Sequence, residues 1–219
     1  MNWRHRLQSS FRRSAPVDQA RWVMLDVETS GLDTRRDRLL AIAAIGMRVD
    51  WSARTLSIDL GDSFEVVLRQ NEASPKDNIL LHGIGVQKQR DGMEPTQALR
   101  AFADFAGHSP LLAFHAAFDE AMIGRYARLH LGADLRNPWL DIDHLCAVTH
   151  GEVRARALDD WMSHFGITCA VRHQAAADTL AACELLQRIW PQLAPQCQNW
   201  RDVQRLAARH RWLSARNLA

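Results

Sequence analysis

The sequence predicts an α/β domain, in which helices cover a mixed sheet with a three-stranded antiparallel portion. Three adjacent strand patterns with short links occupy residues 21–69, which favours an antiparallel meander. From about residue 95 the apolar period lengthens to that of amphipathic helices, with one short apolar strand among them. This order is typical of a sheet covered by helices. A chain of 219 residues is long enough to bury a substantial core.

The three strands of the meander follow from their apolar runs. A first strand is predicted over residues 21–28, with apolar side chains on both faces. The polar segment 30–37 turns the chain into a long second strand over residues 39–50. Residues 55–69 form a third strand, which Gly61 and Asp62 are expected to interrupt.

The helices are predicted from apolar stripes that end at a glycine or a proline. A short inner strand over residues 111–116 separates the first two of them. The predicted helices cover residues 95–106, 118–131, 157–165 and 175–190, and they stop at Gly107, Gly132, Gly166 and Pro191, respectively. A last amphipathic helix is expected between residues 195 and 219, with inward-facing Trp200, Val203, Leu206 and Ala207.

The chain is expected to have three parts: a basic arm or short helix over residues 1–20, a main domain over 21–192 and a helical extension over 193–219. There is no run of about 18 apolar residues, so we expect no membrane span. The four cysteines show no CxxC pairing and the N-terminus has no apolar secretory segment, which favours a reducing cytoplasm over a zinc or disulfide framework. Nor does the sequence contain a glycine-rich phosphate loop.

Two acids, Asp26 and Glu28, end the first strand and share one of its faces. Like charges so close together, and partly shielded from water, disfavour each other's ionisation. A divalent cation removes the conflict, because carboxylate oxygens are ligands that Mg²⁺ and Mn²⁺ prefer. By itself this Asp-x-Glu pattern is also common in proteins that make no use of it.

Two further acids and a histidine stand near helix starts. Asp119 falls where the inner strand passes into a helix; helix capping explains it in isolation, but such strand ends also gather ligands in α/β sheets. Asp178 shares a helix face with apolar residues and so points toward the sheet, which is costly unless it is paired or liganded. His173 is expected in the loop before that helix, either over a site or as an ordinary surface histidine. Asp159 and Asp160 are interpreted as a solvated helix face.

Three segments in this order, DVETSGLD (26–33), HAAFD (115–119) and HQAAAD (173–178), resemble the exonuclease motifs of DnaQ-like DEDDh 3′–5′ exonucleases. The proofreading epsilon subunit of the bacterial replicative polymerase, DNA polymerase III, is a member of that family. LHGIG (81–85) and LDIDHL (140–145) resemble the family's HGI segment and DTL strand. The resemblance covers about residues 21–190, and the histidine at position 173 indicates the DEDDh branch.

The resemblance implies an RNase H-like fold and two Mg²⁺ or Mn²⁺ ions. Asp26 would bridge both ions, Glu28 and Asp178 would complete one site, and Asp119 would hold the second ion. His173 would be the general base on the attacking water, a role that imidazole suits because it titrates near neutral pH. The product would be a 5′-mononucleotide released from a 3′ end.

The resemblance also implies substrate contacts. Thr29 would contact the 3′-terminal nucleotide and Leu32 would wedge against its base. Phe118 would pack beneath the site or serve simply as a core aromatic, and His82 would approach the substrate. His115 stands where the family usually has asparagine, so a contact near the bound strand is altered here.

Three functions stay open at this point. The first is a metal-dependent 3′–5′ exonuclease on DNA, with a single-stranded 3′ end as substrate; because the chain shows no polymerase domain, proofreading would need a polymerase subunit as partner. The second is a ribonuclease that trims RNA 3′ ends or short oligoribonucleotides, since one fold serves both sugars. The third is a scaffold that binds nucleic acid but has lost its catalytic residues. All five catalytic positions are filled here, which argues against such a loss.

Overall fold

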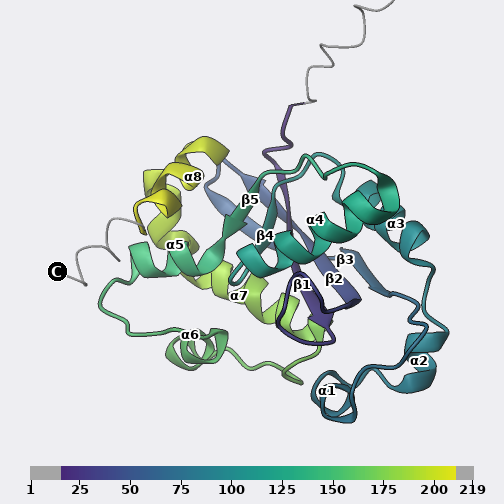
Figure 1. The fold of residues 1–219 in the computed structure, drawn as a ribbon. Coiled ribbons are helices and arrows are strands. Elements are labelled where there is room, and N and C mark those ends of the chain that lie inside the picture. The colour runs from purple at the N-terminus through teal and green to yellow at the C-terminus, as the bar shows by residue number, and fades with distance from the viewer. Residues whose placement is uncertain (1–15, 211–219) are drawn as a thin grey trace, which may run out of the picture.

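A mixed five-stranded sheet forms the centre of the computed structural model, which describes residues 16–210 (Figure 1). The strands are β1 (Arg21–Thr29), β2 (Leu39–Asp50), β3 (Thr55–Val67), β4 (Leu111–Ala113) and β5 (Trp139–Asp141), in the spatial order β3-β2-β1-β4-β5. β1, β2 and β3 pair antiparallel, whereas β4 pairs parallel with both β1 and β5. The predicted α/β class and its antiparallel portion are therefore confirmed, and the sheet is that of an RNase H-like fold.

The third strand is one element, but its pairing with β2 is interrupted at the predicted Gly61 and Asp62. The register shifts there, because Ile45 pairs with Ser63 and Gly46 with Asp59, and the residues between them bulge out of the ladder. A side chain at Gly46 would come within 2.2 Å of the Asp62 carboxylate, so the glycine makes room for the bulge. Arg21 fixes the bulge, because its Nε donates to Asp62 Oδ2 at 2.6 Å.

Helices cover both faces of the sheet (Figure 1). They are α1 (Lys76–His82), α2 (Val86–Arg90), α3 (Pro95–Ala106), α4 (Ala117–Leu131), α5 (Ile142–Thr149), α6 (Leu158–Phe165), α7 (Ala175–Leu193) and α8 (Trp200–Ala208), with a 3-10 turn over Ala194–Gln196. Five of these correspond to predicted helices, whereas α1, α2 and α5 were not predicted.

Three element ends differ from the sequence predictions. The inner strand β4 stops at Ala113 because the chain turns at His115, which has a φ of 59°. The strand-like segment 140–145 is a strand only to Asp141, whose carboxylate then accepts from the Asp143 N–H and caps α5. α7 continues through Pro191, although proline lacks the backbone donor of one intrahelical hydrogen bond, and the helix goes on to bury Leu193.

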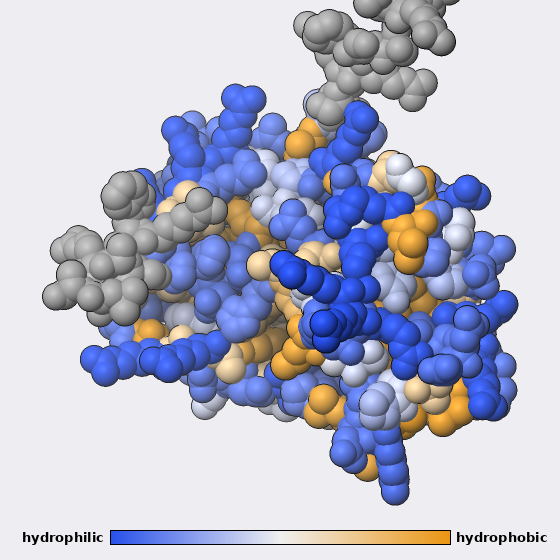
Figure 2. Space-filling view, in the orientation of Figure 1, coloured by the Kyte–Doolittle hydropathy of each residue, from blue (hydrophilic) through white to orange (hydrophobic). Residues whose placement is uncertain are grey.

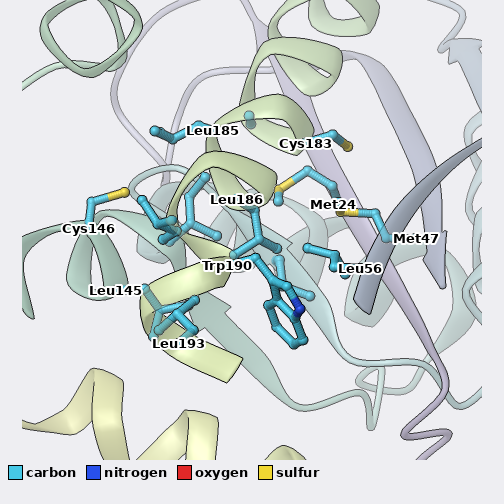
Figure 3. Packing of buried hydrophobic residues seen from close by; sticks show 14 of the residues in the cluster. Met24, Met47, Leu56, Leu145, Cys146, Cys183, Leu185, Leu186, Trp190 and Leu193 are labelled. Carbon is cyan, nitrogen blue, oxygen red and sulfur yellow. The ribbon is translucent and has the colours of Figure 1, made fainter. Parts of the chain in front are cut away.

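Alternation along β1 divides the core between the two faces of the sheet. Val23, Leu25 and Val27 pack with α3 and α4 on one side. Trp22 and Met24 pack on the other side with α7 and its neighbours; Figure 3 shows residues from α7 and α5 gathered against Met24, Met47 and Leu56 of the sheet.

A tryptophan cluster joins the end of the described chain to the sheet. The ring of Trp22 lies 5.1 Å from that of Trp200 in α8 and 5.7 Å from that of Trp190 in α7. Gln19, in the segment before β1, accepts a hydrogen bond from the Trp200 backbone N–H at 3.2 Å. The described parts of the predicted arm and extension thus pack on the main domain, while residues 1–15 and 211–219 lie outside the described residues.

The four cysteines are free, and three of them are buried. Between residues 16 and 210, none of the helices combines the length and the apolar character that crossing a membrane requires.

Candidate active site

Asp26 and Glu28 lie at the end of β1, on the face of the sheet that α7 covers. Both side chains are partly buried. Burial is the main cause that raises the pKa of Asp26, and the charge of Asp178 adds to it. Burial, followed by the charges of Asp26 and Asp178, raises the pKa of Glu28 to about 9. The predicted conflict between like charges is therefore present in the fold.

Asp119 lies near Asp26 but comes from α4, which packs on the other face of the sheet. It lies in the first turn of α4 and is only 4% exposed. Burial, then the charge of Asp26, raises its pKa well above the ordinary value. Simple capping of a surface helix does not account for such burial, so the position favours the site interpretation.

Asp178 lies in the first turn of α7 and is 7% exposed. One carboxylate oxygen accepts from the guanidinium of Arg172, and the other accepts from the backbone N–H of His173 at 3.0 Å. His173 is in the loop before α7, as predicted, and its side chain is exposed. The structure thus places the histidine beside the acids but outside their helix.

The four acids are linked electrostatically around the end of β1: the charge of Asp178 helps to raise the pKa of Asp26 and Glu28, and the charge of Asp26 helps to raise the pKa of Glu28 and Asp119. As they stand, no three His, Cys, Asp or Glu side chains of residues 16–210 are arranged as ligands of one ion. The donor chemistry nevertheless fits hard divalent cations: these are buried carboxylates whose joint ionisation needs a counter-charge. Arg172 supplies one such charge in this structure.

The loop that follows β1 holds the predicted substrate contacts Thr29 and Leu32. Thr29 Oγ1 donates to the Gly31 carbonyl at 2.7 Å, and Asp37 closes the loop by accepting from the Asp33 N–H at 2.8 Å. Leu32 is 86% exposed at the loop surface. Hydrophilic side chains project near the middle of Figure 2, where this loop lies in Figure 1. Leu32 thus offers an exposed apolar side chain within a hydrophilic loop, which suits contact with a nucleobase.

His82 does not face solvent. It is 3% exposed, its Nδ1 accepts from the Ile84 N–H at 2.9 Å, and its Nε2 lies 2.7 Å from Asn78 Oδ1. We therefore assign the proton to Nε2, which donates to Asn78. Asn78 in turn donates from Nδ2 to the Thr29 carbonyl at 2.8 Å. The sequence reasoning missed Asn78, for which the neighbouring LHGIG segment was the available signal.

His115 and Phe118 flank Asp119. His115 is exposed, its N–H donates to Asp141 Oδ1 at 3.0 Å, and its Nε2 lies 3.8 Å from Asp143 Oδ2. Its φ of 59° is left-handed, a region that asparagine and histidine enter more readily than most residues. The backbone there can thus tolerate the departure from asparagine. Phe118 is partly buried and packs against the core beneath α4.

Asp141 and Asp159 make contacts that the sequence did not predict. Asp141, which was not singled out, is buried enough that its pKa is raised, and it orients the His115 turn. Asp159 is more than a solvated face, because its carboxylate accepts two hydrogen bonds from Arg172. Asp160 accepts from the Arg156 and Ala157 N–H groups at the start of α6.

The family model described as Exonuclease matches residues 23–186. Among curated proteins, the DNA polymerase III PolC-type of Clostridium perfringens is 26% identical over 171 residues, which are 76% of this chain but 11% of that protein. The PolC-type protein of Bacillus subtilis is 24% identical over 187 residues, or 85% of this chain and 12% of that protein. The chain thus corresponds to a small part of these relatives.

The fold also resembles solved structures. E. coli Exonuclease I in complex with a dT13 oligonucleotide superposes with a TM-score of 0.64, at 17% identity, over 78% of this chain and 41% of that one. The similarity at this level of identity concerns the fold.

Proposed function

The chain belongs to the DnaQ-like exonuclease family of phosphodiester hydrolases, and we propose that it removes 5′-mononucleotides one at a time from the 3′ ends of DNA. The observation that carries this proposal is the convergence of Asp26, Glu28, Asp119 and Asp178 into one buried electrostatic group beside His173. Acids whose pKa values are raised by burial and by one another's charges are expected at functional sites.

In the proposed mechanism the four carboxylates Asp26, Glu28, Asp119 and Asp178 would hold two Mg²⁺ or Mn²⁺ ions. Asp26 would serve both ions, Glu28 and Asp178 would complete one site, and Asp119 would belong to the other. Such ions, when bound, lower the pKa of water and neutralise charge on the attacking and leaving oxygens of a phosphodiester. His173 would accept the proton of the attacking water, because its side chain is exposed and its backbone lies against Asp178.

The side chains around the carboxylates position the 3′ end. Leu32 packs against the terminal base from its exposed place in the loop. Thr29 contacts the terminal nucleotide, and Asn78 fixes Thr29 through its carbonyl. His82 acts through Asn78 and not by direct contact, since both of its ring nitrogens are engaged inside the protein. His115 faces the strand beside Asp119, and Phe118 supports that side from below.

Single-stranded DNA is the substrate that we propose, with a DNA polymerase subunit as partner. In the PolC-type relatives the matching segment belongs to a much longer DNA polymerase. The fold relative Exonuclease I has been solved with a single-stranded oligonucleotide. A frayed 3′ end is single-stranded, so both contexts supply the same kind of end.

The test uses labelled oligonucleotides of matched sequence as DNA and as RNA, single-stranded or as duplexes with a paired or mispaired 3′ end. With Mn²⁺, the expected result is stepwise release of mononucleotides from DNA 3′ ends, fastest from single strands and mispaired ends, and abolished by chelator. Faster hydrolysis of RNA would replace the proposed substrate with a ribonuclease substrate. Binding without chelator-sensitive hydrolysis would support the scaffold function instead.

A further inference from the structure

Arg172 bridges two acids that belong to different helices. Its Nε donates to Asp159 Oδ1 at 2.6 Å and its Nη2 donates to Asp159 Oδ2 at 3.1 Å, so α6 receives a two-pronged contact. The remaining nitrogen, Nη1, donates to Asp178 Oδ1 in α7. The guanidinium can therefore give up Asp178 and still keep both of its bonds to Asp159.

Both oxygens of Asp178 are already engaged. Oδ1 accepts from Arg172 and lies 3.5 Å from Cys169 Sγ, while Oδ2 accepts from the His173 N–H at 3.0 Å. Because Asp178 is 7% exposed, water has little access to take over these bonds. A cation that uses Asp178 as a ligand must displace at least one of its present partners.

The bond to His173 also holds the loop in an uncommon conformation. His173 has a φ of 60°, in the left-handed region that a residue with a side chain seldom adopts. Such a conformation persists only where surrounding contacts determine it. Asp178 provides one of these contacts directly, and a second through the neighbouring Arg172.

We propose that Arg172 is a resident counter-cation of Asp178, which takes the place of a divalent ion at that carboxylate while the site is empty of metal. Loading the ion makes the guanidinium withdraw to Asp159, and it loosens the His173 loop so that the imidazole can be placed over the substrate. This inference rests on the proposed function, since it concerns how the same carboxylates are loaded.

The proposal predicts opposite changes in two measured quantities. Removing the charge of Arg172 leaves Asp178 without a counter-charge beside Asp26 and Glu28, so the metal-free protein becomes less stable. The same change removes the competitor of the ion, so Mn²⁺ binds more tightly. A residue that only braced the loop would give no gain in Mn²⁺ affinity specific to the removal of its own charge.

The experiment measures Mn²⁺ binding by titration calorimetry on the full chain, together with thermal melting in chelator. The variant is Arg172→Gln, and the matched control is Asp159→Asn, which weakens the same bridge but leaves the positive charge at Asp178. Arg172→Gln is expected to melt at a lower temperature in chelator and to bind Mn²⁺ at least about tenfold more tightly, because a charge-assisted hydrogen bond no longer opposes the ion. Asp159→Asn is expected to keep the wild-type affinity within about twofold, since the bond that the ion must displace is unchanged.

Two results would overturn the inference: an unchanged or weaker Mn²⁺ affinity in Arg172→Gln, or an equal gain in both variants, which would assign the effect to a looser loop. Either of these can occur while the wild-type protein binds Mn²⁺ and hydrolyses DNA, in which case the proposed function stands. If the wild-type protein neither binds Mn²⁺ nor shows chelator-sensitive hydrolysis, the proposed function and this inference both fail.

Discussion

Replacing Glu28 with glutamine is expected to stabilise the metal-free protein at neutral pH. The folded protein raises the pKa of Glu28 from 4.5 to about 9, mainly through burial. Between these two values the folded state binds a proton that the unfolded state has released, so the free energy of unfolding decreases as the pH rises. In this range each pH unit lowers the free energy of unfolding by about 1.4 kcal/mol. Between pH 4.5 and 7 the wild-type carboxyl therefore costs at most roughly 3 kcal/mol, which glutamine avoids.

The assay is urea unfolding of the wild-type protein and Glu28→Gln in chelator, at pH 4.5 and at pH 7. The variant should be more stable at pH 7 by about 1–3 kcal/mol, and the difference should nearly vanish at pH 4.5. Added Mn²⁺ should stabilise the wild-type protein more than the variant, because a ligand that binds only the folded state raises its stability. A variant that is less stable at pH 7, or equally stabilised at both pH values, would refute the assignment of Glu28 to a crowded, buried acidic site.

Three other predictions follow from contacts outside the carboxylate group. Asp62→Asn should destabilise the protein by about 1.5–3 kcal/mol at neutral pH. Hydrogen bonding from Arg21 lowers the Asp62 pKa, so this loss should shrink as the pH falls below 3.8, and a constant loss in urea unfolding would contradict the ion pair. Asn78→Ala should raise KM for a single-stranded DNA end by about tenfold, because Thr29 loses the hydrogen bond that supports it. The Mn²⁺ affinity measured by calorimetry should stay the same, and an unchanged KM would contradict the support of Thr29 by Asn78. Trp200→Ala should reduce the free energy of unfolding by about 3–5 kcal/mol, and a change below about 1 kcal/mol would show that α8 is not part of the core.

The fold was predictable where its signals are local. The apolar run of β2 and the stripe of α3, which ends at Gly107, depend on neighbouring residues alone, and both elements lie where they were expected. The early end of β4 depends instead on the His115 turn, whose N–H bonds to Asp141 26 residues later. A single-sequence pattern contains no information about such a partner, so the strand was predicted too long.

The residues of the candidate site were likewise predictable only in part. Its acids and His173 were predicted because their residue types and order resemble a family pattern. The residues that organise them, Arg172 and Asn78, were missed because their roles arise from the packing of separate elements. Asn78 reaches Thr29 across 49 residues, and Arg172 reaches Asp159 across 13. Helix α1, which carries Asn78, has seven residues and lacks a sustained apolar stripe.

The most direct test of the central claim compares the variants His173→Ala and Asp26→Ala. Mn²⁺ binding is measured by calorimetry, and the turnover of labelled single-stranded DNA is measured with the same protein samples. If the acids hold the ions and the histidine moves the proton, His173→Ala keeps Mn²⁺ binding but loses about 10²–10⁴-fold in turnover, whereas Asp26→Ala loses both. Full activity in either variant, or Mn²⁺ binding that is unchanged in Asp26→Ala, would contradict the account.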